Sequence, residues 1–273
     1  MGIIQEYNSF DIYARYDIDA HPDEKDFCMH IHDRYEIYYF VSGKVKYLVE
    51  GYEYSLEPGT IMIMRPGESH AAKIIKDETY ERYSVNFYAS FLDAIDPEHK
   101  WIKPFTDRPL GCGNKYREAE FDDLQLQKVF SKIKNPDTNA YSQHLKVNIY
   151  LLLLFEQISQ AYEKRGFTEY KSPKNLSEQV VAYVNRHLLE ELSVPVLAGK
   201  FFLSTSQFSR IFKQATGSPV WEYIIAKRLT MAKEKIRSGI SAREASAVCG
   251  FGDYSVFYRA YVKHFGCAPT NMD

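Results

Sequence analysis

The stretch Phe208-Ser209-Arg210-Ile211-Phe212-Lys213 continues to Gly217, and a variant of it, Phe257-Tyr258-Arg259-Ala260-Tyr261, continues to Gly266. In both copies an arginine stands two residues after the opening aromatic residue, and a second aromatic residue stands two further on. The copies lie 49 residues apart (257 minus 208). Each follows a short apolar helix and a tight turn, which is the order of a helix-turn-helix. Two such units joined by one helix suit two neighbouring stretches of DNA major groove.

The first copy predicts a helix with one face free for DNA. Ser204-Thr205-Ser206-Gln207 has the form of a capping box, in which the serine oxygen accepts from an early backbone N–H and the glutamine reaches back. We expect Phe208, Ile211 and Phe212 to be buried, which leaves Ser206, Ser209, Arg210 and Lys213 on the other face. A guanidinium can bond to a guanine edge while a lysine lies near phosphate. The alternative for Arg210 is a structural salt bridge.

The second copy predicts a similar helix. A long helix from Pro219 to Ser238 precedes it, and about 20 residues at ~1.5 Å each give about 30 Å. That length is close to the roughly 34 Å between major-groove faces one helical turn apart. Ser241 to Glu244 predicts a further capping box and a helix to Cys249, and Gly250-Phe251-Gly252 predicts a turn. The helix Asp253 to Phe265 would then expose Tyr254, Ser255, Tyr258 and Arg259.

The region from Leu176 to Pro269 resembles the DNA-binding domain of the AraC/XylS family of transcription regulators. The motifs that carry the resemblance are Leu197-Ala198, Arg210-Ile211-Phe212-Lys213, Gly217, Tyr223, Arg228-Leu229 with Ala232, Cys249-Gly250-Phe251, Phe257, Arg259 and Gly266. The resemblance implies two helix-turn-helix units, a promoter DNA partner, contact with RNA polymerase and, more often than repression, activation. The residues it and the capping pattern assign to DNA are Ser204, Thr205, Ser206, Gln207, Ser209, Arg210, Lys213, Tyr254, Ser255, Tyr258 and Arg259.

The second unit departs from the family pattern. Tyr261-Val262-Lys263 stands where Phe-Lys usually follows the arginine, and Ala245-Ser246 replaces a larger apolar residue plus alanine. The chain also ends at Asp273 without the usual Tyr-Arg close. These departures favour a second unit that binds phosphate more than it reads bases.

Charge is divided unevenly along the chain. From Asn175 onward 12 Lys and Arg face 8 Asp and Glu, a net of +4, whereas the first 174 residues carry 22 against 28, a net of −6. The basic third is the part expected to approach a polyanion, and uneven surface charge is the alternative. Four cysteines without CxxC spacing favour a reduced, cytoplasmic protein. The longest apolar run, Val147 to Phe155, is too short for a membrane span, so no membrane partner is expected.

The predicted fold class is α+β, with a cupin-like β-barrel, a helical pair and an all-helical C-terminal domain. Short runs rich in β-branched and aromatic residues, punctuated by Gly and Pro, place the barrel at about residues 7–90. Helical spacing predicts helices within 118–164, so that residues 1–165 form an effector-binding and dimerisation domain. Residues 166–175 are the expected linker and 176–273 the DNA-binding domain. Leu151 and Leu154 fall outside a single helical stripe and predict a second contact, with the barrel or with a partner subunit of a homodimer.

The barrel region carries His30-x-His32-x3-Glu36 and, further on, Pro66-Gly67-x2-His70. On a barrel strand His30, His32, Glu36 and Tyr38 would share one face, because residues two apart point the same way. This set resembles the ligands of the cupin family, and N/O sites of this kind suit zinc, nickel, iron or manganese. The alternative is a hydrogen-bonded framework around a small-molecule pocket. Cys28 is expected to be a core thiol.

An effector pocket is expected between the strands, lined by Arg15, His30, His32, Glu36, Tyr38, His70 and Asn86. Aromatic walls with a few polar groups suit sugars and related polyols. The favoured interpretation is therefore a ligand-responsive transcription regulator, an activator of carbohydrate-utilisation genes and not an enzyme. The alternatives are a metal-dependent cupin enzyme or metal sensor fused to a DNA-binding domain, and a repressor without effector whose barrel serves only oligomerisation.

Overall fold

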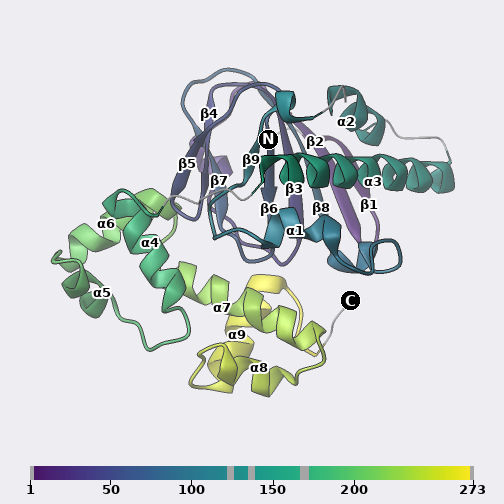
Figure 1. Cartoon of the computed structure of the whole chain (residues 1–273). Coiled ribbons are helices and arrows are strands. Elements are labelled where there is room, and N and C mark those ends of the chain that lie inside the picture. The colour runs from purple at the N-terminus through teal and green to yellow at the C-terminus, as the bar shows by residue number, and fades with distance from the viewer. Residues whose placement is uncertain (1–2, 122–125, 135–138, 167–171, 271–273) are drawn as a thin grey trace.

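A computed structural model describes residues 3–121, 126–134, 139–166 and 172–270, and its N-terminal domain consists of two antiparallel sheets (Figure 1). The larger sheet has the order β1-β2-β8-β3-β6-β9, and the smaller has the order β5-β4-β7. The strands are β1 (Ile3–Asn8), β2 (Ile12–Asp19), β3 (Tyr35–Ser42), β4 (Val45–Val49), β5 (Tyr52–Ser55), β6 (Ile61–Met64), β7 (His70–Ile74), β8 (Tyr80–Phe87) and β9 (Lys115–Tyr116).

Alternation along the strands gives the large sheet two different faces. On β2, Ile12, Ala14 and Tyr16 face a core that also includes residues of the covering helices. The intervening Arg15 and Asp17 face the barrel interior, where they form an ion pair. A separate apolar cluster, which includes Tyr38, Tyr47 and Tyr80, fills much of the space between the two sheets. One face therefore holds the domain together while the other is available to line a polar site.

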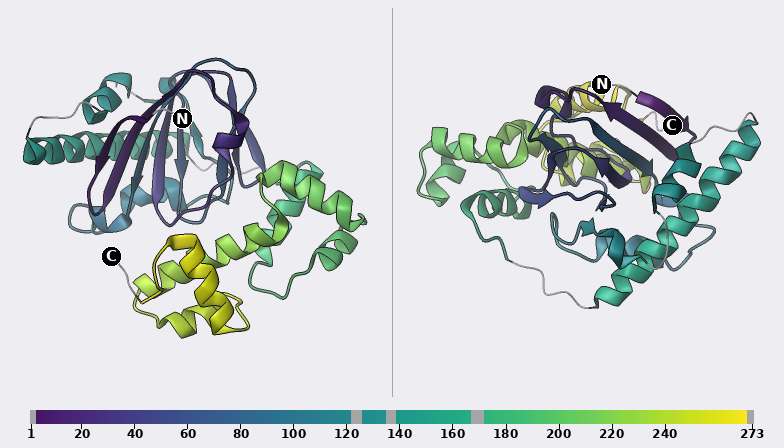
Figure 2. Two further views of the ribbon diagram at one scale, coloured as in Figure 1. Left: turned by 180° about the vertical axis from the view of Figure 1, so that it is seen from behind. Right: turned by 90° about the horizontal axis from the view of Figure 1, so that it is seen from above.

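Helices cover the outer face of the large sheet (Figures 1 and 2). The main ones are α2 (Leu126–Lys134) and α3 (Ala140–Arg165), with the short elements η2 (Ala89–Leu92), η3 (Lys100–Ile102), α1 (Lys103–Thr106) and η4 (Glu118–Glu120). The short helix η1 (Glu24–Phe27) instead packs against β7, beside the barrel interior. Leu151 and Leu154 are fully buried in the core against the sheet. The barrel is thus their contact, which resolves the two alternatives that the sequence left open.

The C-terminal domain is entirely helical within the part of the chain that the structure describes. Its helices are α4 (Leu176–Arg186), α5 (Val194–Lys200), α6 (Thr205–Thr216), α7 (Val220–Arg237), α8 (Ala242–Val248) and α9 (Tyr254–Phe265). It has two cores, and α7 contributes to both: Tyr223 and Ile224 pack with α4, α5 and α6, whereas Leu229 and Ile236 pack with α8 and α9. At ~1.5 Å per residue its 18 residues span about 27 Å.

Several expectations need correction. The first helix of this domain, which the sequence predicts from Leu176 to Leu192, ends at Arg186, since the chain turns at His187. The barrel also extends beyond residues 7–90, because β1 begins at Ile3 and β9 lies at Lys115–Tyr116. Residues 122–125 of the first expected helix, residues 167–171 of the expected linker and residues 271–273 lie outside the described residues. No helix in the described ranges is long and apolar enough to cross a membrane.

Candidate functional site

The first reading helix, α6, begins and ends as its sequence predicts. Ser204 Oγ accepts a hydrogen bond from the Gln207 backbone N at 3.2 Å, and Gln207 Oε1 accepts one from the Ser204 backbone N at 3.0 Å. Gly217 ends the helix in the left-handed conformation, at φ 74°. The capping box is therefore confirmed, and it already uses the Ser204 hydroxyl and the Gln207 carbonyl oxygen.

The outward face of α6 carries the groups expected to meet DNA. Phe208 and Phe212 are fully buried, whereas Arg210 and Lys213 are exposed. Thr205 and Ser206 are exposed as well, and Ser209 is half-buried. Among the described residues Arg210 forms no ion pair, so the salt-bridge alternative finds no support. The guanidinium is thus available to a base edge or a phosphate.

The second reading helix, α9, has a similar design with a different cap. Asp253, not a serine, accepts from the Val256 backbone N at 3.0 Å. Phe257 and Tyr261 are buried, while Ser255, Tyr258 and Arg259 are exposed and Tyr254 is half-buried. The expected cap of α8 is half confirmed: Ser241 accepts from the Glu244 backbone N, but the reciprocal bond from the Glu244 side chain is not among the bonds of the described residues.

Arg228 holds the two units together. Its side chain is buried in α7 and donates from Nε to the Leu188 carbonyl at 2.8 Å. It also donates from Nη1 to the Gly250 carbonyl and from Nη2 to the Glu190 carbonyl, both at 2.7 Å. Leu188 and Glu190 follow α4, whereas Gly250 precedes α9. One guanidinium thus links the loops of both helix-turn-helix units, which helps to fix the spacing of α6 and α9.

A cavity of about 270 Å³ opens in the barrel of the N-terminal domain. Four of the seven expected pocket residues line it: Arg15, His30, Glu36 and Tyr38. His32 and His70 lie behind Glu36, and Asn86 pairs in register with Glu36 without lining the cavity. The lining residues that sequence reasoning missed are Asp26, Phe27, Cys28, Tyr47, Ala72, Tyr80, Arg82 and Ser84. Alternation along β8 would have found Arg82 and Ser84 had that strand been recognised.

One wall of this cavity has buried polar groups with unused bonding capacity. Arg15 Nε lies 2.8 Å from Asp17 Oδ2, and Arg82 Nη1 donates to Asp19 at 2.8 Å. Arg15 Nε, both carboxylate oxygens of Asp17 and Arg82 Nη2 are buried without a well-oriented hydrogen bond in the described part of the chain. Burial raises the pKa of Asp17, against the effect of the two arginines. Asp17 is fully buried behind Arg15 and Arg82, and these two arginines line the cavity, so they can donate hydrogen bonds to a polar ligand.

The histidine cluster is compact, although it does not lie on one strand. Each of His30, His32, Glu36 and His70 offers a ligand atom, and these atoms lie within 4.8 Å of one another. His30 and His32 precede β3, which begins only at Tyr35, so the expectation of a shared strand face was wrong. An isolated β-bridge between His30 and His70 brings the two segments together instead. Cys28 is exposed and is not the expected core thiol.

The hydrogen bonds of this cluster fit a metal ion. The three Nδ1 atoms face the carbonyl oxygens of Cys28, Arg34 and Glu68, at 3.2, 3.0 and 2.8 Å. Because a carbonyl only accepts, each Nδ1 carries the hydrogen and Nε2 is left as the metal-binding nitrogen. His32 Nε2 and His70 Nε2 lie 3.0 and 3.1 Å from Glu36 Oε2.

Glu36 determines what the cluster can hold. Burial opposes its ionisation, but the hydrogen bonds from His32 and His70 hold its pKa well below the ordinary value. Without an ion, both imidazoles would have to be protonated to donate at both ring nitrogens. A divalent cation between the Nε2 atoms and the carboxylate would satisfy the same acceptors with neutral rings.

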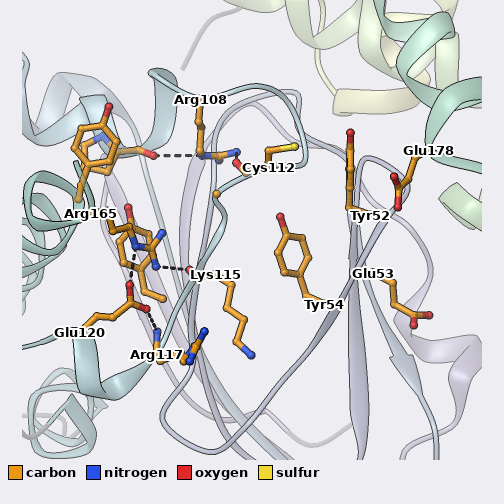
Figure 3. A pocket seen from close by; sticks show the side chains of 14 residues that line it. Tyr52, Glu53, Tyr54, Arg108, Cys112, Lys115, Arg117, Glu120, Arg165 and Glu178 are labelled. Carbon is orange, nitrogen blue, oxygen red and sulfur yellow. Dashed lines mark hydrogen bonds and ion pairs between the residues drawn. The ribbon is translucent and has the colours of Figure 1, made fainter. Parts of the chain in front are cut away.

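A larger cavity, of about 700 Å³, lies outside the barrel between β5, β9 and the end of α3 (Figure 3). Several of its charged groups already have partners. Arg108 is paired with Glu68 at 2.7 Å, Arg165 with Glu120 at 2.7 Å, and Lys115 Nζ donates to the Ser55 carbonyl at 2.6 Å. The barrel cavity is therefore the better candidate for a polar effector, despite its smaller volume.

A β-barrel with a polar cavity, followed by two exposed reading helices on one linking helix, defines a DNA-binding protein with a ligand-binding domain. The pattern of the AraC-like ligand binding domain matches residues 13–169, and that of a helix-turn-helix domain matches residues 197–273. The first match alone covers more than half of the chain. The chain belongs to the AraC family of transcription regulators, as the sequence motifs indicated.

Relatives of the whole chain are distant. The HTH-type transcriptional activator RhaS of Mannheimia succiniciproducens is 23% identical over 248 residues, which are 89% of this chain and 88% of that protein. The Msm operon regulatory protein of Streptococcus mutans is 24% identical over 282 residues, covering 100% and 98%. Among solved structures, fatty-acid-bound ToxT of Vibrio cholerae aligns with a TM-score of 0.43 at 12% identity, covering 97% of this chain and 95% of ToxT.

Proposed function

We propose that this regulator binds a specific promoter sequence in response to a small polyhydroxylated effector and activates carbohydrate-utilisation genes, through contact with RNA polymerase in the cytoplasm. The observation that carries the DNA-binding part is a pair of exposed arginines, Arg210 and Arg259, on two reading helices joined by α7; neither forms an ion pair within the described residues. Activation is supported by the relative that is named a transcriptional activator.

The barrel cavity supports a sugar or sugar-like polyol as the effector. Arg15 and Arg82 line the cavity and can donate hydrogen bonds, and the carboxylates of Asp26 and Glu36, which also line it, can accept them. The aromatic rings of Tyr47 and Tyr80 offer apolar faces beside these polar groups. Hydroxyl groups both donate and accept, so a polyol meets both needs, whereas a fatty acyl chain meets neither.

Two measurements test this function. Selection from a random pool of double-stranded DNA should yield one preferred sequence, bound more tightly than the rest of the pool. Sugars and polyols, screened by thermal shift, should yield a ligand whose effect on melting is lost in Arg82→Met. A protein that retains no DNA preference is not a sequence-specific regulator, and one stabilised by no member of a broad polyol panel does not have the proposed effector class.

The histidine cluster favours a second property, a resident divalent metal held by His30, His32, Glu36 and His70. A bound ion would supply a Lewis-acidic centre for effector oxygen atoms, beside the arginine wall. Zinc, nickel, iron and manganese all suit this donor set. Elemental analysis of untagged protein purified without chelator should give about one ion per chain, lost in His32→Ala. The enzyme alternative would further require turnover, and metal without turnover would argue against it.

We also propose that the protein is a homodimer that pairs through α3. Tyr141, Leu145 and Ile149 are spaced four residues apart, so they form one stripe, and each is exposed. Tyr141 and Ile149 are 71% and 62% exposed, which is unusual for large apolar side chains on a helix that otherwise packs well. A second copy of the same stripe would cover them in a symmetric interface.

A further inference from the structure

The segment Met29–Asp33 touches the barrel cavity and the DNA-binding domain at the same time. His30 lines the cavity, and His32 Nε2 lies 3.0 Å from Glu36 Oε2 within the histidine cluster. The odd-numbered residues of this segment face the DNA-binding domain. Ile31 packs against the core of the first helix-turn-helix unit, and Asp33 is paired with Lys233 and Arg237 at 3.0 and 3.2 Å. One short segment thus presents its even-numbered side chains to the sensor site and its odd-numbered ones to the DNA-binding domain.

Met29 lies against the end of the first reading helix. A Cβ atom placed on Gly217, the residue that ends α6, would lie 3.0 Å from Met29 Cβ. Gly217 also has φ 74°, a conformation that disfavours other residues. The end of a reading helix is therefore seated directly on the residue next to His30.

The segment around Gly67–His70, which carries the third histidine of the cluster, is also bonded to the DNA-binding domain. Gly67 donates from its N to the His32 carbonyl at 2.9 Å, and its own carbonyl accepts from Lys227 Nζ of α7 at 2.6 Å. Ser69, next to His70, donates from its backbone N to Glu50 at 2.6 Å, and Glu50 in turn is paired with Lys227. Both segments that carry the three histidines are thus bonded to each other and to α7.

Contacts between the barrel and α7 can affect DNA binding because of where α7 lies in the DNA-binding domain. The helix contributes to both helix-turn-helix cores, and Arg228 within it links their loops. Its barrel contacts are spread along the helix, at Tyr223 and Lys227 in the first half and at Lys233 and Arg237 in the second. The reading faces of α6 and α9 remain exposed in this arrangement, so the barrel does not cover them. Any control exerted here would act on the placement and rigidity of α7.

We propose that occupancy of the His30–His32–Glu36–His70 cluster controls how firmly the DNA-binding domain docks on the barrel, with Met29–Asp33 as the coupling segment. This inference rests on the proposed function, since it gives the regulatory route of the same effector site. A ligand that holds His30 and His32 in place also holds Met29, Ile31 and Asp33, because all five share one short backbone. Filling the cluster therefore favours the docked arrangement, and docking in turn tightens ligand binding by the same factor.

Hydrogen–deuterium exchange of the full chain, incubated with zinc so that the wild-type cluster is occupied, tests the coupling directly. His30→Ala, which changes only the cavity side of the segment, should speed exchange in α7 roughly fivefold or more. Ser84→Ala is the matched control, because Ser84 lines the same cavity from β8, away from the coupling segment. It should leave α7 unchanged. Equal exchange of α7 in wild type and His30→Ala would overturn the proposal.

The reverse experiment covers the case in which His30→Ala damages the barrel, which would appear as faster exchange in β2 and β8. Lys233→Met with Arg237→Met alters only α7 and should speed exchange in residues 29–33 and at the start of β7. If residues 29–33 exchange as in wild type, the proposal fails whatever His30→Ala shows.

Zinc ions serve as the probe of cluster occupancy. Zinc at a concentration that loads the wild-type protein should slow exchange in α7, and it should have no such effect in His30→Ala. Zinc without effect on α7 in a loaded protein would contradict the coupling. None of these exchange measurements uses DNA, so they test the coupling independently of the proposed function. Linked exchange in a protein without DNA preference would contradict only the proposed function. Effector-dependent DNA binding without linked exchange would contradict only the role of the coupling segment.

Discussion

Glu50 and Lys227, 177 residues apart in the sequence, form a buried ion pair between the barrel and the DNA-binding domain. Glu50 also accepts from Tyr223 Oη at 2.5 Å and from Asn185 Nδ2 at 2.6 Å. Burial, followed by the nearby Glu50 carboxylate, raises the pKa of Tyr223 well above its ordinary value, so the phenol stays a donor. The Glu50 carboxylate, at the tip of the β4–β5 hairpin, therefore bonds to three side chains of the DNA-binding domain.

The backbone conformation at Glu50 is unfavourable for glutamate, which indicates that the position holds this residue for its carboxylate. Glu50 and Gly51 connect β4 to β5 with φ values of 51° and 84°, the left-handed pattern of a tight hairpin turn. Asn, Asp and Gly are favoured at the first of these positions, whereas glutamate is strained there. The next residue must be small, since a Cβ on Gly51 would lie 3.0 Å from Val181 Cγ2 of α4.

Glu50→Asn should loosen the docking of the two domains without unfolding either. Asparagine suits the turn but is shorter and uncharged, so the bonds to Lys227, Tyr223 and Asn185 are lost. Breaking a buried pair costs about 3–5 kcal/mol when the partner charge stays buried. Here the cost is limited to the docking free energy, because Lys227 regains water once the domains separate. Small-angle scattering should show a larger radius of gyration.

Glu53→Gln is the control for this change, because Glu53 lies on the same hairpin but forms a solvent-exposed pair with Lys46. It should leave the radius of gyration as in wild type. An unchanged radius in Glu50→Asn would mean that the other interdomain contacts suffice for docking.

Arg228→Met should weaken specific DNA binding although Arg228 does not face DNA. The three carbonyls of Leu188, Glu190 and Gly250 lose their donor, and the spacing of α6 and α9 loses a restraint. Each unsatisfied carbonyl costs about 1–3 kcal/mol unless water reaches it. We expect a lower melting temperature together with weaker binding to the selected site. Arg243→Met, an exposed change on α8, should affect neither, and equal affinity in both variants would refute this role of Arg228.

Arg210→Ala and Lys213→Ala should separate base reading from phosphate binding. Loss of the Arg210 guanidinium should reduce discrimination between the selected site and its single-base variants by about 1–3 kcal/mol. Loss of the Lys213 ammonium should weaken all DNA about equally and reduce the salt dependence of log K by about one unit. Titrations at several salt concentrations measure both. If neither change alters binding to the selected site, α6 is not the reading helix.

The exposed stripe on α3 makes a prediction about assembly. Leu145→Glu combined with Ile149→Glu should give a monomer in sedimentation equilibrium, because two charges per subunit would meet their copies across the interface. Both side chains are exposed, so the melting temperature of the barrel should change little. Glu156→Gln on the same helix, outside the stripe, should remain dimeric. A wild-type monomer at micromolar concentration would contradict the proposed interface.

Glu120 and Arg165 give the N-terminal domain a measurable pH dependence. Burial opposes the charge of Glu120, but hydrogen bonds from Arg165 and from the Arg117 backbone, both at 2.7 Å, hold its pKa below the ordinary value. The Glu120 carboxylate therefore stabilises the folded protein at pH values above its ordinary pKa of about 4.3. This stabilisation is lost as the pH falls through the lower pKa that Glu120 has in the folded protein. The difference in melting temperature between wild type and Glu120→Gln should be largest near neutral pH and shrink below about pH 4.

Glu98→Gln provides the comparison for this pH series. Glu98 pairs with Lys100 at 2.8 Å, but both side chains are open to solvent. Water and salt screen such a pair, so its removal should change the melting temperature less than Glu120→Gln does at the same pH. A Glu120→Gln difference that does not vary with pH would show that the carboxylate acts only through packing.

Much of the C-terminal domain could be predicted from sequence because its signals are local. Ser204 and Gln207 form a cap within one helical turn, and Phe208 and Phe212 define the buried face of the same helix. The exposed positions of Arg210 and Lys213 follow from that periodicity alone. Strands such as β8 were missed because Tyr80–Phe87 is polar on its cavity face, so it lacks the apolar character of a buried strand.

The sequence by itself determined the order of domains, the two reading helices and the residues of the histidine motif, since each depends on spacing within a few turns or strands. Only the tertiary structure brought His70 to His30 through a β-bridge, and only it brought Arg82 to Asp17 behind the cavity. The contact of Glu50 with Lys227 likewise had no local signal. Pairs separated by more than a hundred residues depend on how whole domains pack, and periodicity along the chain carries no information about that packing.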